Sequence, residues 1–261
     1  MTDHPTTIQL IGGPTALLTY GGLRILTDPT FDPPGEHPRP GTEVVLRKLT
    51  GPALATGDLL PIDLVLLSHD HHADNLDPAG RAFLPMAAGV LTTKAGAERL
   101  GGNAVGLEPD QTAELHAPDA GAVHITAVPA EHGSPEVAAK NGPVIGFVLR
   151  GEGLPTIYVS GDNASVEVAA QIARQHGPFD AAILFAGGAR VPVLWGDTLL
   201  TLDAARAAEV AGLLEPAVIV PIHQEGWEHF TSPPEELRRA FSAAGLDERL
   251  RAVEPGAQVE L

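Results

Sequence analysis

The chain contains no cysteine, and this absence excludes three kinds of chemistry. Disulfide bonds, thiolate metal ligands and thiol nucleophiles all need a cysteine side chain. Any metal site in this protein must therefore use histidine, carboxylate or amide groups. The absence does not by itself identify a cellular compartment.

Basic residues are also scarce. There are 16 Lys and Arg against 33 Asp and Glu, which gives a formal net charge of −17. Nucleic-acid binding depends on Lys and Arg contacts to phosphates, and binding to anionic lipid surfaces needs the same charges. The composition predicts no nucleic-acid and no membrane partner. A bound metal could still attract a small anionic substrate, because the ion dominates the charge around it.

Long hydrophobic runs are missing as well. No apolar stretch reaches the roughly 18 residues that a membrane-spanning helix needs. Residues 1–5 lack the basic start and apolar run of a secretory signal, so we expect a cytoplasmic protein. A length of 261 residues is enough for one domain with a two-layered core. We predict a single domain over residues 1–261 and leave the oligomeric state open.

What the chain does contain is a histidine-rich segment, LLSHDHHADNLD, at residues 66–77. The apolar run 64–67 leads into it and predicts a buried strand. Side chains two apart on an extended chain point the same way, so His69 and His71 could bind one metal ion. Asp74 could add an oxygen ligand. The alternative is a polar loop with solvated histidines.

Three further polar residues follow predicted strands. His132 comes after the apolar alternation of residues 122–128, Asp162 ends the segment IYVSGD, and His223 ends VIVPIH. Each residue alone is a weak signal. The ordered set is typical of a sheet edge that carries metal ligands.

The rest of the chain predicts an α/β (α+β) domain with helix, sheet, sheet and helix layers. Strands are expected at 7–11, 16–20, 23–26 and 181–185, and one or two more within 250–261. Helices are expected at 77–84, 166–176, 202–214 and 233–244, with Asp77, Ser165 and Ser232 as N-caps. The Pro- and Gly-rich residues 30–58 are expected to be a long loop inserted over the site.

This pattern resembles the metallo-β-lactamase-fold hydrolases over nearly the whole chain. Their signature is His-x-His-x-Asp-His, followed by a single His, a single Asp and a final His. The matching residues are His69, His71, Asp74, His132, Asp162 and His223. The segments Thr27-Asp28-Pro29, Ser160-Gly161-Asp162 and Gly226-Trp227-Glu228-His229-Phe230 are similar to the branch that contains the ascorbate-6-phosphate lactonases.

The resemblance implies a four-layer αββα sandwich and one or two divalent metal ions, zinc or manganese. His69, His71 and His132 would hold the first ion, with Asp162 close by. Asp162 would bridge to a second ion held by Asp74 and His223. These last three residues are the ones expected to act in catalysis. A metal lowers the pKa of bound water to about 7, which provides a nucleophile near neutral pH.

Two positions depart from the family signature. Asp74 lies three residues after His71 instead of two, and Asn75 replaces the following histidine. An amide oxygen is a poorer zinc ligand than imidazole and suits manganese or magnesium better. His72 could take the place of the missing imidazole.

Each of three other residues has two alternative interpretations. Asp28 either orients a ligand histidine or forms an Asx-type turn before Pro29. Arg190 either binds a substrate carboxylate or phosphate through its forked donors or is solvated. His229 either contacts the substrate, with the option of donating a proton, or packs at the surface.

The favoured function is hydrolysis of a small ester, lactone or phosphodiester by metal-activated water. One alternative is a non-catalytic metal-binding or ligand-binding member of the fold, which the replacement at Asn75 keeps open. A di-iron redox protein is the other alternative. Fold and ligand set do not name the substrate.

Overall fold

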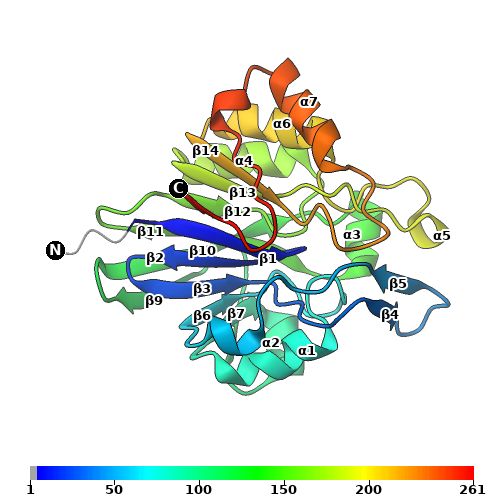
Figure 1. Cartoon of the computed structure of the whole chain (residues 1–261), viewed down its shortest axis with the longest axis horizontal. Helices are drawn as coiled ribbons and strands as arrows, with labels where there is room; N and C mark the ends of the chain where they lie inside the picture. The colour runs from blue at the N-terminus through cyan, green and yellow to red at the C-terminus, as the bar shows by residue number, and fades with distance from the viewer. Residues whose placement is uncertain (1–4) are drawn as a thin grey trace.

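The computed structural model describes residues 5–261. Residues 1–4, on which the cytoplasmic expectation partly depends, lie outside that range. Two large β-sheets face each other, and helices cover the outer face of each sheet (Figure 1). This is the αββα sandwich that the sequence predicts. Among residues 5–261, no helix combines the length and the apolar character that crossing a bilayer would require.

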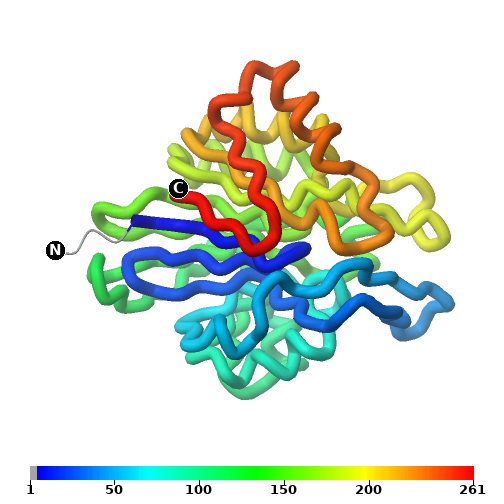
Figure 2. Tube along the Cα trace, viewed as in Figure 1, coloured from blue at the N-terminus to red at the C-terminus, as the bar shows by residue number. Residues whose placement is uncertain are grey.

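The first sheet has seven strands in the order β15-β1-β2-β3-β6-β7-β8. Its strands are β1 (Thr7–Gly12), β2 (Thr15–Tyr20), β3 (Leu23–Thr27), β6 (Leu64–Leu66), β7 (Val90–Thr93), β8 (Ala104–Leu107) and β15 (Gln258–Glu260). The strands β3, β6, β7 and β8 run parallel to one another. The C-terminal β15 pairs with β1, so the last residues of the chain lie beside the first strand (Figure 2).

The second sheet has six strands in the order β14-β13-β12-β11-β10-β9. Its strands are β9 (Thr112–Ala117), β10 (Gly121–Ala130), β11 (Val144–Gly151), β12 (Ile157–Val159), β13 (Ala181–Phe185) and β14 (Val218–Ile222). The strands β12, β13 and β14 are parallel. All five residues of β13 are apolar and buried, as expected for a central strand covered on both faces.

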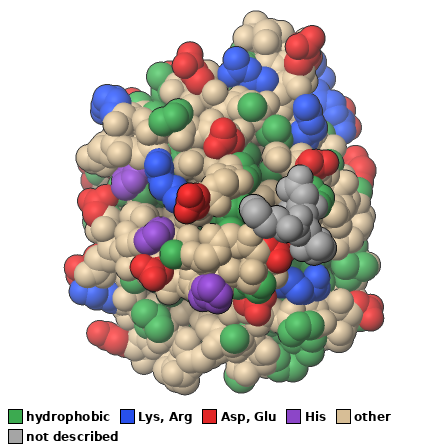
Figure 3. Space-filling view, turned by 90° about the vertical axis from the view of Figure 1, so that its left-hand side faces the viewer, with side chains coloured by type: hydrophobic (Ala, Val, Ile, Leu, Met, Phe, Trp, Pro, Cys, Tyr) green, Lys and Arg blue, Asp and Glu red, His purple; other side chains and the backbone are tan. Residues whose placement is uncertain are grey.

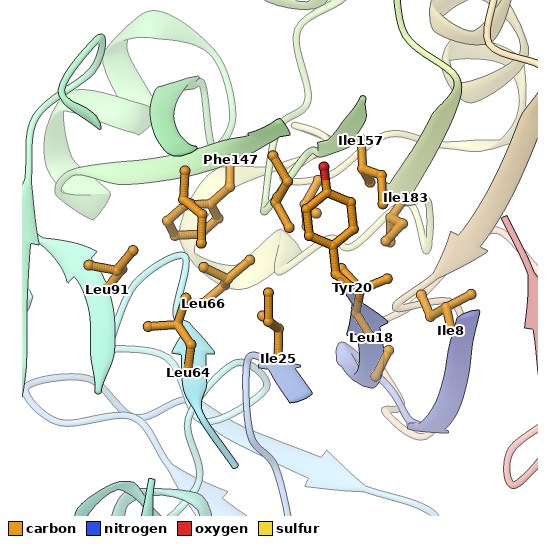
Figure 4. Close-up of a cluster of buried hydrophobic side chains, with 14 of the residues drawn as sticks. Ile8, Leu18, Tyr20, Ile25, Leu64, Leu66, Leu91, Phe147, Ile157 and Ile183 are labelled. Atoms are coloured by element: carbon orange, nitrogen blue, oxygen red, sulfur yellow. The ribbon is translucent and has the colours of Figure 1, made fainter. Parts of the chain in front are cut away.

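The main core lies between the sheets. Leu18, Tyr20, Ile25 and Leu66 from the first sheet face Phe147, Ile157 and Ile183 from the second (Figure 4). The alternation of apolar side chains along each strand sends one set into this layer and the other set toward the helices. The paired sheets thereby form a rigid base for the loops at their ends.

The helices α4 (Val166–His176), α6 (Ala204–Leu214) and α7 (Pro234–Ala243) cover the second sheet. On the outer face of the first sheet lie α1 (Pro78–Phe83) and, next to β7 and β8, α2 (Lys94–Leu100). The predicted N-caps Asp77 and Ser165 are confirmed, because their side chains accept from the backbone N–H of Gly80 and Val168. Short 3-10 turns occur at η1 (Thr56–Leu59), η2 (Leu84–Met86) and η3 (Asp247–Arg249).

Two predictions about elements need correction. Residues 30–58 are not one long loop: they contain the antiparallel hairpin β4 (Gly35–Pro38) and β5 (Val45–Lys48) as well as η1. Ser232 does not cap α7, because its hydroxyl accepts instead from the backbone N–H of Ala204 at the start of α6. That hydroxyl therefore serves a neighbouring helix.

The hairpin β4–β5, α3 (Pro135–Asn141) and α5 (Pro192–Trp195) lie together at one end of the sandwich, at the right of Figure 1. A separate apolar cluster joins this end of the molecule. It includes Val44 and Leu46 from the hairpin region, Val137 from α3, and Leu200 and Trp227 from loops. We call this group the end cluster.

Candidate metal centre

The histidines and carboxylates singled out in the sequence converge at this same end of the sandwich. His69 follows β6, His132 follows β10, Asp162 follows β12 and His223 follows β14. In the second sheet β10, β12 and β14 run in the same direction, so the loops that follow them meet at one edge, and His69, which follows β6 of the facing sheet, lies there as well. These four side chains are buried.

The first group of side chains gathers around His69. Its ligand atoms lie within 4.8 Å of those of His132 and Asp162, and it forms a second such group with His71 and His72. The sequence predicts one ion held by His69, His71 and His132. The structure brings His132 and Asp162 to His69 directly, whereas His71 meets His69 and His72 at ring-centroid distances of 4.7 and 4.4 Å.

The second group gathers around the carboxylates Asp74 and Asp162. His223 Nδ1 is 3.3 Å from Asp162 Oδ1, and His223 Nε2 is 3.7 Å from Asp74 Oδ2. His229 Nε2 is 3.0 Å from the same Asp74 oxygen. Asp162 therefore lies between the two groups, where a bridging residue would have to be. Their assignment as metal ligands stays a prediction.

The two departures from the family signature have clear positions. His72 Nδ1 is 2.9 Å from His69 Nε2, so this imidazole faces the first group. Asn75 is fully buried, and its amide nitrogen donates to Asp162 Oδ1 at 3.1 Å. Asn75 thus holds the central carboxylate, while its own amide oxygen has no hydrogen-bond partner among residues 5–261.

Asp28 was expected either to bind a ligand histidine or to form a turn before Pro29, but its side chain binds Ser68 instead. Its Oδ1 accepts from the backbone N–H of Ser68 at 3.0 Å and from the Ser68 hydroxyl at 2.6 Å. The Ser68 hydroxyl in turn lies 2.9 Å from His69 Nδ1. Asp28 therefore acts on His69 through Ser68. With its proton on Nδ1, His69 leaves Nε2 free to bind a metal.

His132 is held in the same manner. Its Nδ1 lies 2.7 Å from the backbone carbonyl of Leu200, which can only accept, so Nδ1 carries the proton. Its Nε2 is then the atom that can bind a metal. A backbone carbonyl of the 187–200 segment thereby fixes a histidine that follows β10.

Several buried polar atoms at this centre lack hydrogen-bond partners within residues 5–261. They are Asp162 Oδ2, both nitrogens of His71 and of His223, His72 Nε2 and His229 Nδ1. Buried polar groups are nearly always satisfied in folded proteins, so a convergent set of unsatisfied ones calls for an explanation. Imidazole nitrogens and carboxylate oxygens around a common space fit a divalent metal ion.

The electrostatics favour neutral imidazoles in the first group. Burial lowers the pKa of His69 well below its usual value, and the neighbouring His71 and His132 lower it further. Burial likewise lowers the pKa of His72. A neutral imidazole is the form that binds a metal. In the second group burial is the largest effect on His223 and disfavours its charged form, but the carboxylates of Asp162, Asp74 and Asp28 together outweigh burial and raise the pKa of His223.

Arg190 lies to one side of the centre. Its guanidinium donates to the backbone carbonyl of Asp197, and it lines a cavity of ≈ 760 Å³ together with Glu131 and Gly133, the neighbours of His132. Within residues 5–261, no hydrogen bond or ion pair joins Arg190 to the candidate ligands. The 187–200 segment lines this cavity, and through Val191 and Leu200 it also packs in the end cluster with Val44 and Leu46 of the 30–58 segment.

Two residues at this centre, Ser68 and Arg39, have little or no signal in the sequence. Ser68 positions His69, and its only signal was a hydroxyl directly before the first histidine of the cluster. Arg39, from the turn of the β4–β5 hairpin, donates to Asn141 Oδ1 at 2.9 Å beside the centre. A single Arg in a Pro-rich stretch gives no sequence signal of that location.

Comparison with known proteins agrees with this geometry. Residues 23–224 match the family model described as the beta-lactamase superfamily domain. A UPF0173 metal-dependent hydrolase of Pyrococcus furiosus is 26% identical over 259 residues, covering 95% of this chain and 97% of its own. A UPF0173 metal-dependent hydrolase of Anaeromyxobacter dehalogenans is 27% identical over 257 residues, covering 92% of this chain and 81% of its own.

Solved structures are similar in fold. An isothiocyanate hydrolase from Delia radicum gut bacteria superposes with a TM-score of 0.82 at 24% identity, over 98% of both chains. A possible metal-dependent hydrolase from Veillonella parvula superposes with a TM-score of 0.84 at 17% identity, over 99% of this chain and 100% of its own. The matched domain model covers well over half of the chain, which therefore belongs to the beta-lactamase superfamily and has the metallo-β-lactamase fold.

Proposed function

We propose that the protein hydrolyses a small ester, lactone or phosphodiester at a centre of one or two divalent metal ions. The observation that carries the proposal is the set of unpartnered buried nitrogen and oxygen atoms that converge around Asp162. A divalent ion held there polarises a substrate oxygen and activates water near neutral pH. The proposed ligands are His69, His71, His72, His132, Asp162, Asp74 and His223.

The residues divide the work between two sides of Asp162. On one side, Ser68 and the Leu200 carbonyl accept from Nδ1 of His69 and of His132, which leaves the Nε2 atom of each as the proposed metal ligand. On the other side, Asp74 accepts from His229 and lies beside His223. His229 is the side chain placed to pass a proton to a leaving group, since it contacts a carboxylate and is only partly buried.

Zinc and manganese are both compatible with these ligands. The imidazole-rich side formed by His69, His72 and His132 suits zinc. The side with Asp74, Asp162 and a single imidazole from His223 accommodates the harder manganese ion. Elemental analysis of the purified protein distinguishes these ions from iron, which a di-iron redox protein would contain.

The substrate panel follows from the resemblances. It contains an aryl ester, a lactone, an aryl phosphodiester and an organic isothiocyanate. The lactone tests the likeness to the ascorbate-6-phosphate lactonase branch. The isothiocyanate is the substrate class named for one protein of similar fold.

The test compares three samples on this panel: the metal-loaded protein, the protein after treatment with a chelator, and the Asp162→Asn variant. We expect hydrolysis of at least one small substrate, its loss on chelation, and its recovery on adding metal. Asp162→Asn should lower turnover strongly, because this side chain lies between both groups. Metal bound at full stoichiometry without hydrolysis of any panel member would favour the alternative of a non-catalytic binding protein.

A further inference from the structure

Arg39 lies in the turn of a hairpin that is fixed over the candidate metal centre. Its backbone N–H donates to Val44 O at 2.8 Å, and its carbonyl accepts from the Thr42 hydroxyl at 3.0 Å. Val44 and Leu46 pack in the end cluster beside Val137. The turn is therefore held by local hydrogen bonds and by apolar packing against α3.

The base of the hairpin is anchored as well. Lys48 Nζ is 2.8 Å from Asp77 Oδ2, and both side chains are buried. Backbone hydrogen bonds join Leu49 to Gly226 and Glu228 to Arg47 at 2.7 and 3.0 Å. Because both ends of the hairpin are fixed by these contacts, the fold itself sets the position of Arg39 over the site.

The guanidinium of Arg39 is connected to the centre through Asn141. Arg39 Nη2 donates to Asn141 Oδ1 at 2.9 Å, and Asn141 Nδ2 donates to the His132 carbonyl at 3.4 Å. The next residue, Gly142, is so close to His71 that a β-carbon there would lie 3.6 Å from the His71 ring. Arg39 thus sits at the His71 and His132 side of the centre.

The positive charge of Arg39 interacts electrostatically with both Asp74 and His69. Burial lowers the pKa of Arg39, and the Asp74 carboxylate partly restores it. Arg39 is in turn one of the cations that lower the pKa of His69, after burial and the neighbouring histidines. The guanidinium is therefore within electrostatic reach of both groups of candidate ligands.

Most of the hydrogen-bonding capacity of Arg39 is unused. Within residues 5–261 its side chain makes one hydrogen bond, to Asn141, and no ion pair within 4.0 Å. By contrast, Arg47 on the same hairpin faces Glu36 and Glu228, and Arg99 pairs with Asp70. A half-buried guanidinium with free N–H groups is matched in geometry to a carboxylate or phosphate, which it can bind through two parallel hydrogen bonds.

We propose that Arg39 binds an anionic group of the substrate and thereby selects anionic substrates for this hydrolase. The group is a carboxylate or a phosphate that lies beside the metal centre, at the Asn141 edge, while the scissile bond lies at the ligands around Asp162. This inference depends on the proposed hydrolase function. In a chain with a net charge of −17, a positive group placed here offsets the general repulsion of an anion.

The kinetic test compares Arg39→Gln and Arg39→Lys with the matched control Arg47→Gln. Arg47 lies on the same hairpin, and its side chain is exposed. The substrates are an ester that carries a carboxylate, the same ester with a phosphate in its place, and a neutral analogue. In Arg39→Gln the ratio of kcat/KM for anionic over neutral substrate should fall about 10–100-fold, mostly through KM. Arg39→Lys should recover part of the ratio, and Arg47→Gln should keep it.

A binding test separates this inference from the proposed function. Inorganic phosphate and acetate are titrated into the metal-loaded protein and the same variants by calorimetry, after thermal unfolding and metal content have shown that the variants are intact. We expect Arg39→Gln to raise the Kd of at least one anion about 10-fold or more, and the anion affected identifies the group that Arg39 binds. Equal Kd values in Arg39→Gln and Arg47→Gln, or no anion binding by the unaltered protein, would overturn the role of Arg39. If no substrate is hydrolysed but the Kd changes as expected, the hydrolase proposal fails while the anion site stands.

Discussion

Ser68 is not a candidate ligand itself, but it orients the candidate metal ligand His69. Its hydroxyl lies between the Asp28 carboxyl group and His69 Nδ1, so it keeps the Nε2 atom of His69 directed at the centre. Loss of such an orienting partner typically weakens metal binding by 10–100-fold. We expect Ser68→Ala to weaken metal affinity by about that factor, measured by competition with a chromophoric chelator. The control is Ser242→Ala on the exposed face of α7, and equal affinities in both variants would contradict this role of Ser68.

Asp28 should give the metal-free protein a pH-dependent stability. Burial raises the pKa of Asp28 to about 8, against the opposing effect of the Ser68 hydrogen bonds. The unfolded chain releases this proton near pH 4, but the folded chain keeps it up to about pH 8. The folded state therefore binds more protons across this window, and the free energy of unfolding falls as the pH rises from about 4 to 8.

The Asp28→Asn variant isolates this effect. An amide oxygen can still accept from Ser68, but the side chain carries no charge. Relative to the unaltered protein, the variant should gain up to about 1.4 kcal/mol of stability per pH unit between pH 5 and 8. Urea unfolding of both proteins with chelator present provides the measurement. A difference in stability that stays constant over this range would show that Asp28 does not hold a proton.

At the scale of single residues, the sequence predicted which side chains meet but not how they are used. Strand patterns followed by His69, His132, Asp162 and His223 were sufficient to predict their convergence, because strand ends share an edge. The orientation of Asn75 depends on its hydrogen bond to Asp162, which lies 87 residues further along the chain. No local pattern carries that information, and the same is true of the pairing of Arg39 with Asn141.

At the scale of elements, the buried Lys48–Asp77 ion pair anchors the base of the β4–β5 hairpin alongside its backbone hydrogen bonds. Asp77 Oδ2 accepts from Lys48 Nζ and from the backbone N–H of Asp32, and Asp77 Oδ1 accepts from Phe31 and Gly80. The same carboxylate therefore caps α1 and anchors the end of β5. Removing Lys48 leaves this buried charge with backbone donors alone.

We expect Lys48→Met to lower the free energy of unfolding by about 3 kcal/mol, because one partner of a buried pair is lost. The matched control Arg47→Met removes an exposed pair from the same strand and should cost less than about 1 kcal/mol. Limited proteolysis should in addition cut Lys48→Met faster within residues 35–48. Equal stability and equal proteolysis of the two variants would show that the ion pair does not anchor the hairpin.

The elements that sequence patterns predicted well are those whose own side chains form the core. The strands β1, β2, β3 and β13 alternate or run continuously in apolar residues, and this periodicity defined them. The strand β4, with the sequence GEHP, has no such pattern. Its pairing depends on β5 and on packing in the end cluster, which are tertiary effects.

At the scale of the whole molecule, loops and short elements pack over one end of the sandwich and close it. Val44, Val137, Leu200 and Trp227 come from four segments far apart in sequence, and all four pack in the end cluster. The face at the opposite end, at the left of Figure 1, carries charges of both signs and scattered histidines (Figure 3). Basic side chains do not gather there into a surface that would follow a phosphate backbone.

This charge distribution leads to a prediction about substrate size. A polyanion is repelled along much of the surface of a molecule with a net charge of −17. A small anion contacts only the centre, where the proposed metal ions and Arg39 attract it. We expect the metal-loaded protein to hydrolyse small panel substrates and to leave a long single-stranded RNA uncut at low salt, measured on gels beside the small-substrate assay.

Salt separates the two explanations for any RNA cleavage that does occur. Cleavage that rises with salt would reflect relief of repulsion, because salt screens like charges as well as unlike ones. Cleavage that is strong at low salt and weakens as salt is added would instead reveal an attractive phosphate-binding surface, and the small-substrate prediction would then be wrong.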